Sequence, residues 1–227
     1  PPPGAWVRGA AAAAGGRGPG APPRPGSFAE LFFPTTLFMA LLFVAMGLSD
    51  DLWRERLLGT LRRARTTPQP IGALFLGKVL AGAAITAAVT AVGLAVAGAL
   101  FRPALGAALS ALAWGTAASV VLTLMMTAVQ LHAASQRAGH LLANVLLFPL
   151  LMLGGAFFPF EVMPDWMARA GRMTPNGFAL VEFKWLLAGG SDSGRLARDL
   201  ALAAVLGAVF FALCTARLRR GFGGAGG

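Results

Sequence analysis

Residues 51–80 read DLWRERLLGTLRRARTTPQPIGALFLGKVL, a basic amphipathic stretch that lies between two long apolar runs. Its first half carries the arginines Arg54, Arg56, Arg62, Arg63 and Arg65. Each of them would cost about 2.5–3.5 kcal/mol at the centre of a bilayer, so the stretch cannot cross a membrane. It must therefore lie on a membrane face.

A helix over residues 51–65 would be amphipathic. Trp53, Leu57 and Leu61 recur at every fourth position, with Leu58 beside them. They would form one apolar stripe opposed by guanidinium groups, which is typical of an interfacial helix. Such a helix can contact lipid on one side and a partner protein on the other. The alternative is a surface helix that only anchors the topology of the chain.

The composition is that of an integral membrane protein. Hydrophobic residues make up 56% of the chain and charged residues 12%, and the mean hydropathy is +0.69. Soluble domains carry about 25% charged residues. The net charge of +10 gathers beside apolar runs, which favours anionic membrane lipid as a partner and argues against nucleic acid. The single cysteine, Cys214, excludes an intrachain disulfide or a thiolate metal cluster.

Five apolar runs are long enough to span, or nearly span, about 30 Å of hydrocarbon. They cover residues 28–48, 79–100, 105–131, 141–158 and 200–216. The predicted fold class is an all-α integral membrane protein with about five transmembrane helices, a cytoplasmic interfacial helix and short outer re-entrant helices. The predicted domains are a disordered low-complexity segment (1–27), a transmembrane domain (28–220) and a flexible Gly-rich tail (221–227). We also expect the chain to be truncated at its N-terminus.

The distribution of basic residues predicts the orientation. The segments 49–78 and 132–140 and the tail after Ala216 gather more than half of the chain's Lys and Arg residues on one side. That side is predicted to be cytoplasmic, together with the C-terminus. We expect a multi-pass protein of the cell membrane, in bacteria the inner or plasma membrane.

The segment 154–190 is apolar but interrupted. Prolines and charged residues break it so often that no part of it can span: Pro159, Glu161, Pro164, Asp165, Pro175, Glu182 and Lys184. Short helices that dip partway in from the outer face are predicted, because broken backbone at membrane depth must be surrounded by protein or by a wet cavity.

No catalytic, cofactor-binding or metal-ligating residue is predicted. Residues 72–78 match GxxxxGK, but Val79 replaces the Ser or Thr that would hold magnesium, and Lys78 is expected to extend to the lipid headgroups instead. His132 and His140 border a loop with no acidic or thiol neighbour in sequence. The predicted spans contain almost no ionisable residues, whereas ion-coupled carriers usually keep some near mid-membrane. The driving energy is therefore expected to come from elsewhere.

Two motifs resemble those of a known family. Residues 55–61 read ERLLGTL and are followed by TTP at 66–68 and LGK at 76–78. Residues 154–159 read GGAFFP and are followed by MPDW at 163–166 and TPNG at 174–177. In this order, the two sets resemble the cytoplasmic segment and the outer re-entrant helices of the permeases of type-2 ABC exporters.

The resemblance implies a six-span half-transporter that forms a homodimer or a pseudo-symmetric dimer. It also implies a separate cytoplasmic ABC ATPase subunit that binds the ATP and magnesium, so that this chain needs no cofactor. The implied ATPase-coupling helix comprises Trp53, Arg54, Glu55, Arg56, Leu57, Gly59, Thr60, Leu61, Arg62 and Arg63. The implied outer re-entrant region comprises Gly155, Phe158, Pro159, Glu161, Pro164, Trp166 and Pro175.

The function expected on these grounds is that of a transport subunit rather than an enzyme. It would move an amphipathic substrate, such as a drug, a lipid or a glycan precursor, outward with energy from the partner ATPase. Two alternatives stay open. One is a secondary transporter or channel driven by an ion gradient, and the other is a membrane scaffold that recruits a cytoplasmic partner without transporting anything.

Overall fold

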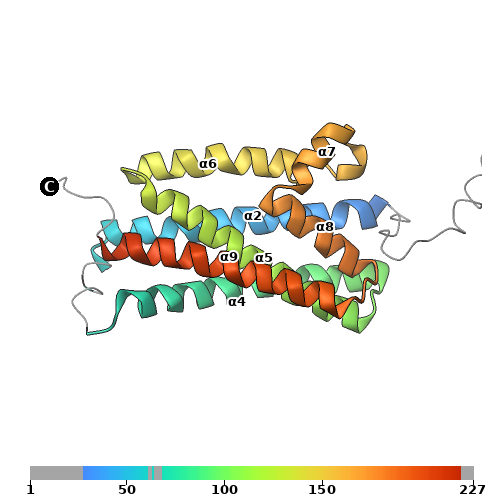
Figure 1. Ribbon diagram of the computed structural model, residues 1–227, viewed down its shortest axis with the longest axis horizontal. Helices are drawn as coiled ribbons and strands as arrows, with labels where there is room; N and C mark the ends of the chain where they lie inside the picture. The colour runs from blue at the N-terminus through green and yellow to red at the C-terminus, as the bar shows by residue number, and fades with distance from the viewer. Residues whose placement is uncertain (1–27, 61–62, 64–67, 221–227) are drawn as a thin grey trace, which may run out of the picture.

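The computed structural model describes residues 28–60, 63 and 68–220 (Figure 1). In these residues the chain forms seven α-helices and one 3₁₀ turn, with no strand. The elements are α2 (Phe28–Leu57), α4 (Ile71–Phe101), α5 (Leu105–His132), α6 (Gln136–Leu153), η1 (Phe160–Val162), α7 (Asp165–Arg172), α8 (Pro175–Leu187) and α9 (Ser193–Arg219). Five of these helices are long and apolar enough to cross a membrane, namely α2, α4, α5, α6 and α9. The predicted all-α membrane fold is confirmed.

Helix α5 is the centre of the bundle. Its most apolar window is 56% buried, against 17% for α4 and 22% for α9, and it packs against α2, α4, α6, α8 and α9. Gly115 permits this close packing, because a Cβ there would lie 2.9 Å from Thr90 Cγ2 of α4 and 3.2 Å from Phe183 Cε2 of α8. Phe183 in turn meets Phe38 of α2 edge to face, with ring centroids 5.3 Å apart. Gly115 therefore lets α5 approach both α4 and α8 closely.

Helix α2 extends past the predicted span and takes in the start of the predicted interfacial helix. Residues 51–57 form its last two turns rather than a separate element. The helix ends because Gly59 takes a left-handed conformation, with φ of +70°. Ser49 and the acidic residues that follow it do not interrupt the helix, and the Ser49 hydroxyl donates to the Met46 carbonyl. Leu61 and Arg62 lie outside the described residues.

Helix α6 ends earlier than the predicted span 141–158. It stops at Leu153, and Gly155 follows with φ of +78°. A Cβ at Gly155 would lie 2.7 Å from the ring of Phe160, so the chain turns tightly there against η1. The described chain then continues into α7 and α8, which are 8 and 13 residues long and too short to span.

Helix α9 begins earlier than the predicted span 200–216. The Asp192 side chain caps it by accepting the Arg195 backbone N–H at 3.0 Å. Helix α9 therefore also contains Arg195, Arg198 and Asp199, which lie outside the predicted span.

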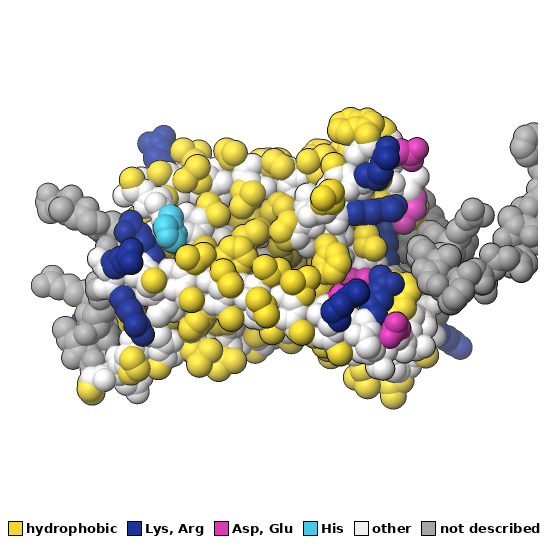
Figure 2. All heavy atoms as spheres, in the orientation of Figure 1, with side chains coloured by type: hydrophobic (Ala, Val, Ile, Leu, Met, Phe, Trp, Pro, Cys, Tyr) yellow, Lys and Arg dark blue, Asp and Glu magenta, His cyan; other side chains and the backbone are white. Residues whose placement is uncertain are grey.

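The two ends of the bundle differ. Figure 1 shows the ends of α2, α5 and α9 at the same end as the starts of α4 and α6, with α7 and α8 at the other end. On the face in Figure 2, hydrophobic side chains cover the middle, Lys and Arg gather at the first end, and mixed charges gather at the second. This is the distribution expected of a bundle that spans a bilayer.

Candidate functional site

The first end of the bundle carries most of the residues that the sequence singled out. We call it the basic end, and its described Lys and Arg residues are Arg54, Arg56, Arg63, Lys78, Arg137, Arg217, Arg219 and Arg220. Several of them lie in the last turns of α2 and α9, where cations are favoured by the helix dipole. The Arg217 guanidinium also donates to the Leu131 carbonyl at 3.1 Å and ties α9 to the end of α5.

Trp53 is an anchor inside the protein. Its side chain is 4% exposed, and its indole N–H donates to the Gln130 carbonyl of α5 at 3.1 Å. The Arg56 guanidinium lies over the ring, 5.2 Å from the centroid. A Cβ at Gly139 of α6 would lie 3.3 Å from the indole nitrogen, so three helices meet at this side chain.

A second polar contact between α2 and α5 lies near the indole. The Gln130 side-chain amide donates to the Ser49 hydroxyl at 2.6 Å, and both residues are 1% exposed. Buried polar groups inside a membrane bundle fix one arrangement of the helices, because any other arrangement leaves them unpaired. Ser49, Trp53 and Gln130 therefore fasten the end of α2 to α5.

The residues after Trp53 face outward. Leu57 and Leu58 are each 69% exposed, and Arg54, Thr60 and Arg63 are exposed as well. The structure thus separates Trp53 from Leu57, which were expected to share one apolar stripe. The Arg63 backbone N–H donates to the Gly59 carbonyl, and the Thr60 hydroxyl donates to the Glu55 carbonyl. These contacts hold an outward surface of leucine and arginine against the end of α2.

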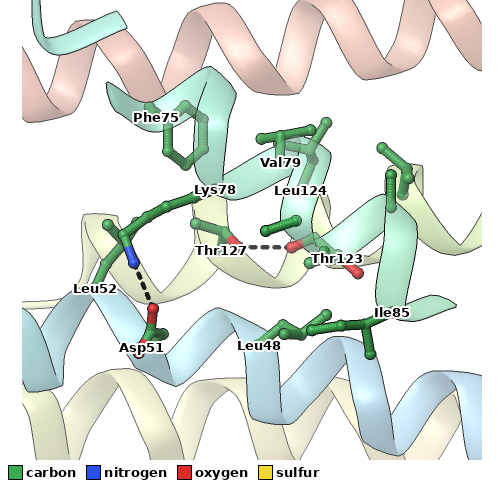
Figure 3. A pocket seen from close by; sticks show the side chains of 14 residues that line it. Leu48, Asp51, Leu52, Phe75, Lys78, Val79, Ile85, Thr123, Leu124 and Thr127 are labelled. Atoms are coloured by element: carbon green, nitrogen blue, oxygen red, sulfur yellow. Dashed lines mark hydrogen bonds and ion pairs between the residues drawn. The ribbon is translucent and has the colours of Figure 1, made fainter. Parts of the chain in front are cut away.

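Lys78 joins α4 to α2 instead of extending to the headgroups. Its amine forms an ion pair with Asp51 (Figure 3) and a second one, at 2.6 Å, with Glu55. Residues 72–78 lie inside α4 and form no phosphate-binding loop.

The two histidines have separate contacts. His140 Nδ1 lies 3.3 Å from the Asp50 carboxylate, which links α6 to α2, so the histidine has an acidic neighbour that its flanking sequence does not show. His132 contacts the Ala128 carbonyl of its own helix. No group of three His, Cys, Asp or Glu residues that could hold a metal ion occurs in the part of the chain that the structure describes.

The opposite end is held by ion pairs between α8 and its neighbours. The Arg195 guanidinium donates both Nε and Nη2 to the Glu182 carboxylate at 2.6 and 2.5 Å, and it stacks 4.3 Å from the Trp185 ring centroid. Glu182 is 3% exposed in this pair. The Lys184 amine binds Glu161 at 3.0 Å. Burial lowers the pKa of Lys184, while Glu161 opposes that shift.

The residues predicted for the outer re-entrant region lie together at this end. Gly155 and Pro159 are buried, whereas Phe158 and Trp166 are 45% and 67% exposed. Pro164 precedes α7 as its N-cap residue. Pro175 opens α8 behind the cap residue Thr174, whose hydroxyl accepts the Gly177 N–H at 3.0 Å. The two predicted sets thus occupy opposite ends of one bundle.

Comparison with known families decides what kind of protein carries this bundle. The family described as ABC-2 type transporter matches residues 19–180, which is more than half of the chain. The chain belongs to the ABC-2 type transporter family. Comparisons with curated proteins and with solved structures gave no match. The chain is therefore a multi-pass membrane subunit of an ABC transporter.

In this ABC-2 type transporter, sequence reasoning missed the contacts of several buried polar residues. Gln130, Asn176, Glu182 and Asp199 are all buried polar residues. Asn176 donates from Nδ2 to the Gly154 carbonyl at 3.2 Å and so closes the turn after α6 onto α8. The sequence signal that could have found them is a polar residue within an apolar segment. Such a residue is costly to bury in a membrane unless it has a partner.

Proposed function

We propose that this chain is the permease subunit of an ATP-driven exporter, which moves an amphipathic substrate outward with energy from a separate ABC ATPase. Two permease copies, identical or related, would enclose the path, and the basic end would face the cytoplasm and bind the ATPase. The observation that supports this most is the outward surface of Arg54, Leu57, Leu58 and Arg63, placed directly beside the buried Trp53 anchor. Acidic groups on the ATPase would pair with the arginines.

The contacts of α2 explain how a movement of this surface could be transmitted to the membrane-spanning helices. Trp53 and Ser49 fasten the end of α2 to α5, Lys78 fastens it to α4, and His140 contacts it from α6. ATP binding and hydrolysis on the partner would then tilt these helices together. A surface attached only by a flexible linker could not transmit such a movement.

The test is ATP-dependent transport by the full-length chain with its ATPase. Arg54→Glu/Arg63→Glu is expected to abolish both co-purification of the ATPase and ATP-dependent export, because the reversed charges repel acidic partners. Arg102→Glu is the matched control, since Arg102 is an exposed arginine at the opposite end of the bundle. Normal export with no ABC ATPase present would overturn the proposal. A scaffold would lose recruitment in the double variant without any flux to lose.

One observation favours an ion-coupled carrier as the second candidate. Asp199 is 2% exposed in α9, and its Oδ2 finds no hydrogen-bond partner among the residues that the structure describes, although Oδ1 accepts from Arg198 at 3.1 Å. Carriers place carboxylates in membrane helices to bind the coupling ion. An uncoupler added at constant ATP would stop such a carrier, and Asp199→Asn would mimic that loss. An ATP-driven exporter would keep its transport rate in the presence of the uncoupler.

A further inference from the structure

An apolar crevice opens between α2, α4 and α5 near the basic end. Its volume is about 180 Å³, and Leu48, Phe75, Val79, Ile85, Val120 and Leu124 form most of its wall (Figure 3). Asp51 and Ile85, which line it, are exposed, so the crevice is open to the surroundings of the bundle. The lining residues of α4 run from Phe75 to Ile85, which sets the length of the crevice at about 15 Å along the helix.

The size and the walls suit part of a hydrocarbon chain or a single ring. An apolar cavity of about 150 Å³ is large enough to hold benzene and stays free of water. The rest of a larger ligand would remain outside, where the crevice meets the bilayer. A ligand that reaches this place from the membrane must itself be amphipathic, because the wall is apolar and the rim is charged.

The rim favours a headgroup that donates hydrogen bonds. Asp51 and Lys78 line the crevice, and Lys78 also pairs with Glu55, which does not line it. The two carboxylates and the one ammonium together carry a net negative charge beside the crevice. An anionic headgroup would meet this net negative charge, with only the third proton of the Lys78 ammonium to bind it. Among the residues that the structure describes, no arginine lines the crevice.

The hydroxyl groups of the crevice also present acceptors. The Thr123 hydroxyl donates to the Ser119 carbonyl at 2.8 Å, and the Thr127 hydroxyl donates to the Thr123 carbonyl at 2.7 Å (Figure 3). Each hydroxyl has one proton, so its oxygen can only accept from a ligand. Apart from the third proton of Lys78, the polar groups left over in this crevice are therefore carboxylate and hydroxyl oxygens.

We infer that this crevice binds an amphiphile with a protonated amine headgroup, with the apolar tail between α2, α4 and α5 and the ammonium beside Asp51. The role of this ligand as exported cargo rests on the proposed function, but its binding does not. The crevice lies within a single chain, so binding requires neither the ATPase nor a second permease copy.

The test uses three photoreactive probes with the same dodecyl chain and a diazirine near its end: dodecylamine, dodecanol and dodecyl phosphate. The full-length chain is placed in phosphatidylcholine nanodiscs, and the labelled residues are identified by mass spectrometry. We expect the amine probe to label the crevice wall about fivefold more than the other two, the effect of one partly exposed ion pair. Equal labelling by all three probes, or stronger labelling by the phosphate probe, would overturn the inference. The latter result would indicate a lipid phosphate.

Pairs of matched variants test whether the ligand binds in the crevice. Ala83→Leu fills the crevice and should remove most of the labelling, whereas Ala84→Leu, on the next and exposed residue, should leave it unchanged. Asp51→Asn should weaken labelling by the amine probe alone, and Asp50→Asn, which is paired with His140 away from the crevice, should not. Thr123→Val keeps the shape of the side chain and removes one acceptor, so it tests the site even if Ala83→Leu fails to fold. Unchanged labelling in Asp51→Asn and Thr123→Val would contradict the assignment.

A transport assay distinguishes failure of this inference from failure of the proposed function. The amine probe is enclosed with the chain, its ATPase and ATP in proteoliposomes, and its movement is measured. Crevice labelling without ATP-dependent movement would overturn the proposed export of this ligand and leave the binding site supported. If the probe moves in an ATP-dependent way and neither Ala83→Leu nor Asp51→Asn slows it, the proposed export would be supported and binding in the crevice would be overturned.

Discussion

The indole N–H of Trp53 donates to the main-chain carbonyl of Gln130 at 3.1 Å, across 77 residues of sequence. This bond joins the last turns of α2 to the last turn of α5, and it lies directly behind the outward surface of Leu57 and Leu58. Because the acceptor is a backbone group, only a change at Trp53 can remove the bond without disturbing α5.

Trp53→Phe is therefore expected to keep an aromatic ring in place while removing the bond. The loss should cost about 0.5–1.5 kcal/mol and lower the melting temperature by a few degrees. Cys214, the chain's one cysteine, is fully buried, so a thiol-reactive dye reports unfolding through it. Leu57→Phe, on the exposed side of the same helix, should melt like the wild type. Equal melting of Trp53→Phe and the wild type would show that the bond contributes nothing.

Glu182→Gln is expected to destabilise the opposite end. The substitution leaves Arg195 without its carboxylate, and the cost should be about 2–3 kcal/mol, less than for a fully buried pair because Arg195 is 30% exposed. Glu161→Gln is the matched control, since its pair with Lys184 is more exposed and should be worth under about 1 kcal/mol. Glu182→Leu/Arg195→Met should recover part of the loss. A smaller effect for Glu182→Gln than for Glu161→Gln in dye-monitored melting would contradict this ranking.

Lys184 is expected to titrate below an ordinary lysine. Burial lowers the pKa of its amine from 10.5, the pair with Glu161 opposes the shift, and Arg172 adds to it. The folded state therefore loses this proton before the unfolded state does, so the free energy of unfolding rises with pH in the window below 10.5. The rate of amine acylation followed against pH should have its midpoint below that of a free lysine side chain, and Glu161→Gln should lower it further. A midpoint at or above that of free lysine would refute the assignment.

The number and order of the spans were predictable because long apolar runs have few alternatives in a chain of this composition. The ends of the spans were not. Whether Ser49 to Asp51 ends α2 depends on contacts with α5, and the helix continues to Leu57 because Ser49 and Trp53 find partners there. The pairing of Glu182 with Arg195 was equally hidden, because it requires the chain to reverse between α8 and α9. The motifs predicted which residues lie at the two ends of the bundle, but they did not predict the contacts that hold the helices together there.

Cysteine labelling is expected to show the basic end inside the cell. Met173→Cys is placed between α7 and α8 where Met173 is 88% exposed, and Leu57→Cys is placed where Leu57 is 69% exposed. A maleimide that cannot cross membranes should label Met173→Cys in intact cells and label Leu57→Cys only after permeabilisation. Buried Cys214 should give no background in the wild type. Labelling of Leu57→Cys from outside would invert the proposed orientation.

Site-specific crosslinking from the basic end tests the central claim most directly. A thiol-linked crosslinker is attached to Leu57→Cys in native membranes, and its products are identified by mass spectrometry, with Met173→Cys as the control at the opposite end. We predict that an ABC ATPase subunit is crosslinked to Leu57→Cys and not to Met173→Cys. Crosslinking of the ATPase to Met173→Cys alone, or of no ATPase to either position, would contradict the account.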